Sequence, residues 1–306
     1  MTEFVTICEV GPRDGLQMAK TIMPTEAKIA WIRALAASGL REIEVGSFVP
    51  AKLLPQMADT ETVVRAAITI PNLIVVALAP NLRGAQAAVA AGAHRISVPV
   101  SISEGHSRAN LNRSPDAQIA EIARIIEWLR SENHPAEFEV ACSTAFGCSF
   151  DGVIAEAQVL HVVTALAEIG VTSLALADTV GYANPAAIKS LVRAVRAEIG
   201  PALHGLHLHD TMGLGLANAL AGLEAGIRDF DSALAGLGGC PFAVGASGNI
   251  VTEDLVFMLE SMGFRSGIAL ADLIDARKLL HAGLPAEPMH GQVAKAGIPG
   301  IYRAAA

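Results

Sequence analysis

The sequence predicts an α/β protein built as a (β/α)8 barrel, the TIM-barrel fold, and three observations support this. Eight short apolar segments alternate with longer segments of helical periodicity along the 306 residues. The apolar segments are mostly non-alternating, which is typical of strands buried on both faces of a parallel sheet. Glycines recur where the helical segments end. A closed barrel is therefore expected, with a doubly wound open sheet as the alternative.

The elements follow from local signals along the chain. Ser114 and Asn184 each precede a proline, which is typical of a capping residue followed by Pro at the first helical position. The strands are expected at residues 4–9, 42–45, 73–78, 95–98, 137–141, 173–177, 206–209 and 229–233. The helix ends are expected at Gly39, Gly92, Gly170, Gly226 and Gly263. Residues 1–306 then form one domain, in which a C-terminal extension begins at about residue 268 with one helix and an irregular tail.

Composition narrows the class of protein. With 52% hydrophobic and 17% charged residues, the chain can bury a large core. Its mean hydropathy is +0.45, but Pro71, Asn72 and Pro80 or repeated glycines interrupt the uncharged stretches, so no membrane-spanning helix is expected. The N-terminus lacks a signal-peptide pattern, and a cytoplasmic protein with free thiols is expected. A net charge of −8 without a basic run argues against a nucleic-acid partner.

Two histidines in the seventh predicted strand indicate a metal site. His207 and His209 are two residues apart, so both imidazoles point to the same face, the barrel interior. A lone inward histidine is more often a hydrogen-bonded core residue, whereas a neighbouring pair suits one divalent cation. Asp14 follows the first strand, which adjoins the last strand in a closed barrel, and supplies an oxygen ligand. These ligand types predict Mg2+ or Mn2+.

Other polar residues near the predicted strand ends have two interpretations each. Glu44, within an apolar strand, is expected to pair with Arg13, either as a structural salt bridge or to hold the arginine in position. Cys240 lies in a glycine-rich loop and is either a proton donor on a lid or a structural thiol. Lys20 either meets a phosphate group or is a solvated surface residue.

Five segments resemble those of 3-hydroxy-3-methylglutaryl-CoA (HMG-CoA) lyases. They are VGPRDGLQ at 10–17, IEVGSF at 43–48, HLHDT at 207–211, GLGGCP at 236–241 and GASGNIVTED at 245–254. The resemblance extends from about residue 5 to about residue 265. The cysteine-containing segment is the most specific, because metal-dependent Claisen-type synthases and aldolases share the Arg-Asp and His-x-His patterns.

The resemblance implies a role for each matching residue. It implies an acyl-CoA substrate, HMG-CoA or a related 3-hydroxyacyl-CoA, cleaved to acetyl-CoA and acetoacetate or the corresponding keto acid, and it implies a homodimer. The implied metal ligands are Asp14, His207, His209 and Asn249. The implied catalytic residues are Arg13, Glu44, Asp178, His207 and Cys240, and the implied substrate contacts are Arg13, Gln17, Lys20 and Asn110.

Three alternatives remain open to the sequence. An isopropylmalate- or homocitrate-type synthase shares the histidine pair, but such enzymes usually carry a further C-terminal region and lack the cysteine loop. A metal-dependent aldolase acting on a 2-oxo acid would not need Lys20 or Cys240. A non-enzymatic binding barrel would not need metal ligands, an arginine and a loop thiol together. We expect the lyase.

Overall fold

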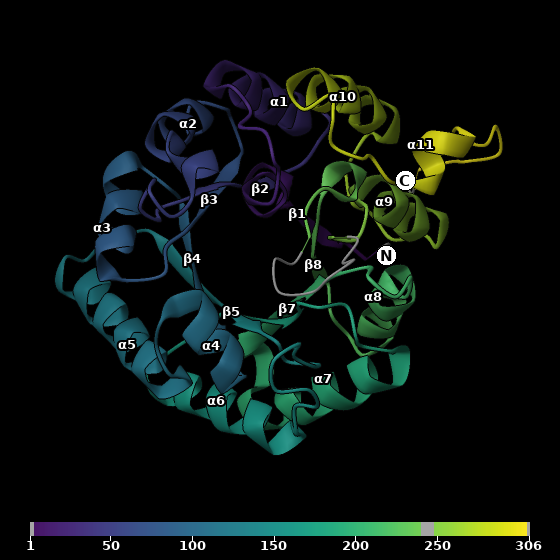
Figure 1. Ribbon diagram of the computed structural model, residues 1–306. Helices are drawn as coiled ribbons and strands as arrows, with labels where there is room; N and C mark the ends of the chain where they lie inside the picture. The colour runs from purple at the N-terminus through teal and green to yellow at the C-terminus, as the bar shows by residue number, and fades with distance from the viewer. Residues whose placement is uncertain (1–2, 240–247, 305–306) are drawn as a thin grey trace.

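The chain folds into a closed eight-stranded barrel, as predicted. The computed structural model describes residues 3–239 and 248–304. The strands pair in chain order, all in parallel, and the last pairs with the first (Figure 1). This closure rules out the open sheet. The strands are β1 (Thr6–Glu9), β2 (Glu42–Ser47), β3 (Ile74–Leu78), β4 (Arg95–Ser101), β5 (Glu137–Ser143), β6 (Leu174–Asp178), β7 (Leu203–Leu208) and β8 (Asp229–Ser232).

The helices form a ring around the barrel (Figure 1). The α-helices are α1 (Thr25–Ala37), α2 (Thr60–Ala67), α3 (Leu82–Ala91), α4 (Glu104–Leu111), α5 (Pro115–Ser131), α6 (Glu156–Glu168), α7 (Pro185–Ile199), α8 (Gly215–Glu224), α9 (Thr252–Ser261), α10 (Leu270–Gly283) and α11 (Gln292–Ala296). Shorter turns are η1 (Gly11–Gly15, π-helical) and the 3-10 turns η2 (Pro55–Met57), η3 (Gly200–Ala202) and η4 (Leu234–Gly236). None of the helices described is long and apolar enough to cross a membrane.

The predicted helix signals are confirmed. The Ser114 hydroxyl accepts a hydrogen bond from the Ala117 amide at the start of α5, and the Asn184 side chain accepts two at the start of α7. The glycines expected at helix ends all have φ between +88° and +108°, a region that side chains with a Cβ rarely adopt: Gly39, Gly92, Gly170, Gly226 and Gly263.

The C-terminal extension contains one more helix than expected. The predicted helix is α10, which packs beside α1 (Figure 1). The additional helix, α11, has five residues, too few to produce a helical period in the sequence. At the start of α11, the amides of Gln292 and Val293 donate hydrogen bonds to the two oxygens of the Asp254 carboxylate. A contact between distant segments therefore stabilises α11.

Candidate active site

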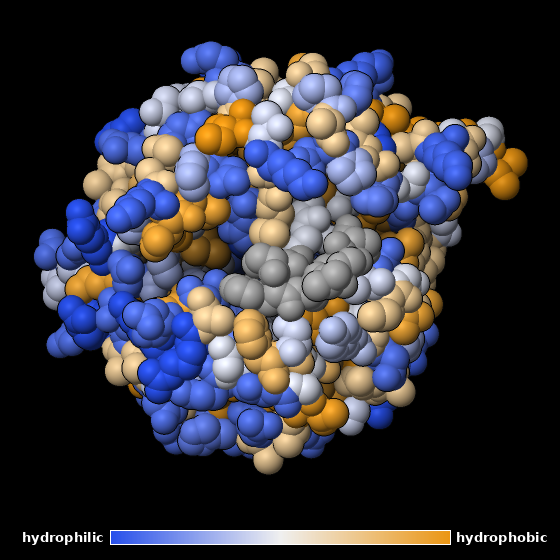
Figure 2. All heavy atoms as spheres, viewed as in Figure 1, coloured by the Kyte–Doolittle hydropathy of each residue, from blue (hydrophilic) through white to orange (hydrophobic). Residues whose placement is uncertain are grey.

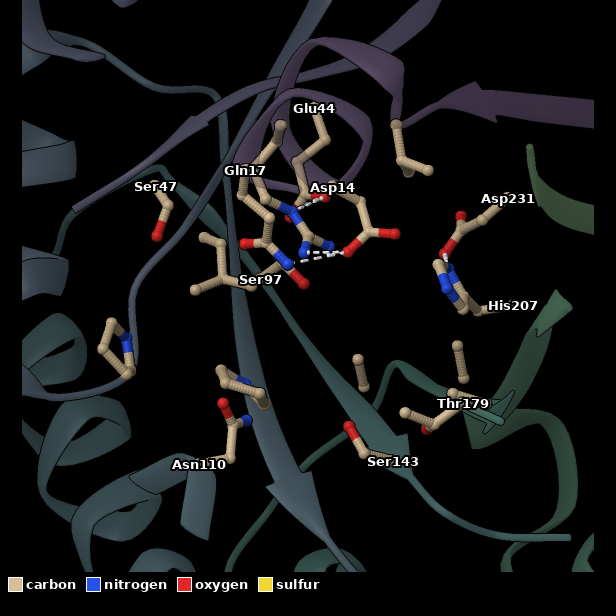
Figure 3. Close-up of a pocket in the computed structure, with 18 of the residues that line it drawn as sticks. Asp14, Gln17, Glu44, Ser47, Ser97, Asn110, Ser143, Thr179, His207 and Asp231 are labelled. Carbon is tan, nitrogen blue, oxygen red and sulfur yellow. Dashed lines mark hydrogen bonds and ion pairs between the residues drawn. The ribbon is translucent and has the colours of Figure 1, made fainter. Parts of the chain in front are cut away.

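The polar side chains singled out in the sequence gather at the C-terminal ends of the strands. The first strand ends at Glu9, and the chain then turns through η1, where the amides of Arg13, Asp14 and Gly15 all donate to the Val10 carbonyl. This turn places Arg13 and Asp14 in the lining of the barrel cavity, where Figure 3 shows Asp14 near Glu44 and Gln17. Asp14 was expected to follow the first strand, and it lies in the turn after that strand.

The four predicted metal ligands come together. Asp14, His207 and His209 each offer one ligand atom, and these atoms lie within 4.8 Å of one another. The two Nε2 atoms of the histidines are 3.0 Å apart, and His209 Nε2 is 3.8 Å from Asp14 Oδ2. Asn249 bridges to His209 across an antiparallel β-bridge and donates from Nδ2 to Asp14 Oδ2 at 2.7 Å. All four residues are buried.

The hydrogen-bonding pattern of this cluster fits a cation. Asp231 Oδ2 lies 3.0 Å from His207 Nδ1, and since a carboxylate only accepts, Nδ1 carries the proton and the Nε2 lone pair faces His209. Two such lone pairs at 3.0 Å repel unless a proton or a cation joins them. The buried Asn249 Oδ1 also lacks a hydrogen-bond partner among the described residues. Rotating the amide by 180° would turn that oxygen toward Asp14 and the imidazoles.

The protonation states also suit a metal. Burial raises the pKa of Asp14, but the charges of Arg13, His207 and His209 outweigh it and hold the pKa at about 2. Burial, with His207 as a further cause, lowers the pKa of His209 to about 3. An ionised carboxylate and a neutral imidazole are the forms that bind cations. The described residues thus offer a competent metal site.

Asp231, on β8, has no counterpart among the site residues expected from the sequence. Its carboxylate fixes the tautomer of His207. Burial lowers the pKa of His207, but the hydrogen bond and the charge of Asp231 outweigh burial and raise it. The sequence signal was weak, because an acidic residue in a short predicted strand is usually solvated. Only the register between β7 and β8, which pairs His207 with Asp231, places the two together.

We expect Asp231→Asn to weaken Mn2+ binding by about 10- to 100-fold, because a hydrogen-bonded carboxylate orients a ligand histidine and raises its basicity. Isothermal titration calorimetry of the metal-free protein with Mn2+ measures the change in dissociation constant. Asp229→Asn is the matched control, since Asp229 lies two residues earlier on β8 and lines the same cavity. Equal affinities for the two variants would remove Asp231 from the site.

Arg13 is held between the carboxylates of Asp14 and Glu44, both of which are labelled in Figure 3. Its Nε lies 2.5 Å from Glu44 Oε2 and its Nη1 lies 2.7 Å from Asp14 Oδ1. Gln17 Nε2 donates to the same Asp14 oxygen at 3.1 Å. The expected pairing of Arg13 with Glu44 is confirmed, and it holds the guanidinium group beside the candidate metal ligands. Burial, opposed by Arg13, raises the pKa of Glu44 to about 7.

A cavity of about 1070 Å³ opens beside this cluster. Its mouth appears as a hollow in the space-filling view (Figure 2). Asn110, on α4, lines the mouth together with Arg13, Asp14 and Gln17. An opening of this size suits a ligand far larger than a metal ion.

Asp178, an expected site residue, supports the loop between β6 and α7. Its carboxylate accepts hydrogen bonds from the amides of Tyr182 and Ala183 in that loop. Lys20 is exposed and is not among the described residues that line the cavity, and its amide donates to Glu287. Cys240 lies outside the described residues.

Glu9, which the sequence analysis did not single out, joins the segments that carry the ligands. Its Oε1 accepts hydrogen bonds from the amides of Gly11 at 2.9 Å and Leu234 at 2.8 Å. Its Oε2 accepts from the Thr252 hydroxyl at 2.7 Å. The carboxyl group therefore braces the turn that carries Asp14 against η4 and the residues after Asn249. Burial raises its pKa to about 8.

Glu9→Gln is expected to change how stability depends on pH. The pKa of Glu9 is raised from 4.5 to about 8 in the folded protein, so its ionisation destabilises the fold as pH rises through that window. Gln cannot ionise. Between pH 4.5 and about 8, the unfolding free energy of the variant should therefore rise relative to that of the wild type by up to about 1.4 kcal/mol per pH unit. Urea denaturation at pH 5 and pH 8 measures this, with the exposed Glu26→Gln as control. A difference that does not change with pH would contradict the prediction.

The barrel and a carboxylate–imidazole cluster at the C-terminal ends of its strands define the class: a (β/α)8-barrel enzyme with a candidate metal site. The HMGL-like family model matches residues 4–280. The cytoplasmic 3-hydroxy-3-methylglutaryl-CoA lyase of Rattus norvegicus is 43% identical over 276 residues, covering 90% of this chain and 80% of the relative. The mitochondrial hydroxymethylglutaryl-CoA lyase of Macaca fascicularis is 42% identical, covering 89% and 83%.

Solved structures agree. An HMG-CoA lyase from Acinetobacter baumannii, in complex with coenzyme A and 3-methylmalate, superposes with a TM-score of 0.92 at 42% identity, covering 98% of this chain and 97% of that one. The chain belongs to the HMGL-like family. The resemblance inferred from the five motifs is confirmed.

Proposed function

We propose that this protein cleaves HMG-CoA, or a closely related 3-hydroxyacyl-CoA, to acetyl-CoA and acetoacetate or the corresponding keto acid. The observation that carries the proposal is the convergence of Asp14, His207, His209 and Asn249 beside the guanidinium group of Arg13. Relatives named as lyases, similar over nine-tenths of the chain, support cleavage over the synthase and aldolase alternatives.

The four convergent residues would hold a divalent cation, Mg2+ or Mn2+. When bound, the cation would supply Lewis-acid polarisation of the substrate's 3-hydroxyl group and lower its pKa. Asp14 or His207 would accept the hydroxyl proton. Nδ1 of His207 already carries a proton, so His207 could act only through an Nε2 that the cation does not hold, and the Asp231 carboxylate would then stabilise the imidazolium that forms.

The remaining steps fall to Arg13 and Cys240. As the C2–C3 bond breaks, its electron pair moves toward the thioester, and negative charge grows on the thioester oxygen. The Arg13 guanidinium, held by Glu44, is positioned to stabilise that charge. Cys240 would then donate a proton to C2, which gives acetyl-CoA. Glu44 and Asp178 orient the surrounding groups, and Gln17, Lys20 and Asn110 are the proposed substrate contacts.

Treatment with EDTA is expected to abolish acetyl-CoA release from HMG-CoA, and added Mg2+ or Mn2+ is expected to restore it. The ligand cluster is the physical reason, since none of its members can replace the cation's charge. Released acetyl-CoA is measured directly, and the melting temperature of the metal-free protein checks that the fold persists. Full turnover by a demonstrably metal-free preparation would contradict the proposal.

Oligomeric state and compartment are further parts of the proposal. We propose a homodimer in the cytoplasm, with an acyl-CoA as its small-molecule partner. The relatives include proteins named as cytoplasmic and as mitochondrial, so cell fractionation is the relevant measurement for the compartment. Light scattering coupled to gel filtration gives the oligomeric state.

A further inference from the structure

The barrel interior beneath the candidate site is open. Barrel interiors are usually filled by layers of bulky branched side chains. Here the cavity that begins at the mouth continues between the strands, where it is lined by Ser97 on β4, Ala141 on β5, Ala175 on β6 and Gly205 on β7. Small residues at these inward positions leave space that larger side chains would fill.

Further along the cavity, Arg95 is already matched by carboxylates. Arg95 on β4 contacts Glu42 at 2.7 Å, Glu137 at 2.7 Å and Glu139 at 3.6 Å. Each of its guanidinium nitrogens has a carboxylate oxygen within these distances. Arg95 therefore presents little unmatched positive charge to a ligand.

The other polar groups around this space add acceptors. His204 lies 3.9 Å from Glu139 through Nε2 and 3.1 Å from the Ser173 hydroxyl through Nδ1. Side chains of His204 and Asp231 keep exposures of 28% and 29% within the barrel, so water reaches them. Burial raises the pKa of Glu139 to about 8, with Arg95 opposing the rise and the nearby carboxylate of Asp231 adding to it.

The depth of this space below the reacting groups follows from strand geometry. Glu42 and Glu44 are two residues apart on β2 and face the same side. Glu42 therefore lies roughly 6.6 Å further along the strand into the barrel than Glu44, which pairs with Arg13. The acyl group of HMG-CoA extends only two carbons beyond C3, roughly 3 Å. Its carboxylate would therefore stop above this level.

Resting on the proposed function, we propose that this inner chamber receives the distal end of a longer 3-hydroxyacyl-CoA chain, and that it selects a chain ending in a hydrogen-bond donor, a hydroxyl or an ammonium group, over one ending in a carboxylate. The inner chamber is lined by Glu42, Arg95, Glu139, Ser173, His204 and Asp231. The CoA moiety is too large to enter the barrel, so it stays at the mouth and directs the acyl chain inward. Two of the chamber carboxylates, Glu42 and Glu139, share the one guanidinium group of Arg95, so above about pH 8, where Glu139 is ionised, a terminal carboxylate would meet an excess of negative charge, whereas a donor would be accepted.

The test compares kcat/KM for HMG-CoA with that for CoA thioesters of longer 3-hydroxy-3-methylacyl chains, with Mn2+ present and at about pH 9, where Glu139 is ionised. The longer chains share one length and end in a hydroxyl, ammonium, methyl or carboxylate group. We expect the hydroxyl- and ammonium-ended chains to be cleaved at least tenfold more efficiently than the carboxylate-ended chain.

Two variants test whether the preference between chain ends arises in the inner chamber. Glu139→Gln is expected to lower the ammonium-to-carboxylate preference by about tenfold, and Glu137→Gln is the matched control. Glu137 contacts the same arginine but is 60% exposed and outside the described cavity lining, so its variant should keep the wild-type preference. Ala141→Leu, which narrows the chamber, should lower kcat/KM for every long chain relative to HMG-CoA.

The outcomes separate the two proposals. If HMG-CoA is cleaved but the four chain ends are treated alike, or if Glu139→Gln and Glu137→Gln behave alike, the inner chamber is not a selective site and the lyase proposal stands. If neither HMG-CoA nor any longer thioester is cleaved with metal present, the proposed function itself is wrong. Should Glu139→Gln not fold, the wild-type panel and Ala141→Leu still decide.

Discussion

Arg13→Met is expected to lower kcat by about 10²- to 10³-fold while KM changes little. The guanidinium is matched to charge that appears on the thioester oxygen only as the carbon–carbon bond breaks, so its loss raises the barrier more than it weakens substrate binding. Met keeps much of the side-chain length without the charge. Steady-state kinetics with HMG-CoA and saturating Mn2+ give both constants.

Two controls make the Arg13 result interpretable. Arg13 also pairs with Asp14, so Mn2+ affinity is measured on the variant to separate lost catalysis from lost metal. Arg124→Met removes a guanidinium group on α5 that is 62% exposed and outside the described cavity lining, and should leave kcat unchanged. A change confined to KM would make Arg13 a substrate anchor instead.

Cys240→Ser is expected to reduce kcat by about 10²- to 10⁴-fold with an unchanged melting temperature and normal Mn2+ binding, if this thiol delivers the proton to C2. A serine hydroxyl is a much weaker acid than a thiol at the same position. Cys142→Ser provides the opposite pattern, because Cys142 is fully buried in β5. Burying a hydroxyl there should lower the unfolding free energy by about 1–3 kcal/mol while kcat is retained.

Alkylation gives a second readout for Cys240. Burial raises the pKa values of the Cys8 and Cys142 thiols, so their reactive thiolate forms are scarce at neutral pH. Iodoacetamide is therefore expected to modify Cys240 first, and bound substrate should protect it. Rapid labelling of Cys8 or Cys142, together with wild-type kcat in Cys240→Ser, would remove Cys240 from the mechanism.

The barrel was predictable because its signals are local. Continuous apolar runs mark strands that are buried on both faces, and a capping residue or a left-handed glycine marks several of the helix ends without reference to the rest of the fold. The pair of histidines was predictable for the same reason, since a spacing of two on a strand fixes a shared face. The location of the site at the barrel mouth was predictable as well, because these polar residues follow the C-terminal ends of the strands.

The supporting residues were not predictable, because their roles depend on contacts across the chain. Glu9 contacts Leu234 and Thr252, more than 200 residues away, and neither neighbour is visible in its local sequence. Asp231 becomes part of the site only through the register of β8 against β7. The role of Lys20 stays a prediction, because the motif alone does not place its side chain, which is exposed and outside the described cavity lining.

The distance in sequence between Asp14 and Asn249, 235 residues, has a consequence for folding. Asp14 follows the first strand and Asn249 follows the last, so their contact crosses the seam at which β1 and β8 close the barrel. The site cannot form until nearly the whole chain has emerged from the ribosome and the seam has closed. A cation bound there would attach only to closed molecules, and would shift the equilibrium between open and closed barrels toward closure in proportion to its free concentration. Metal supply would thereby set the population of correctly closed barrels as well as their activity.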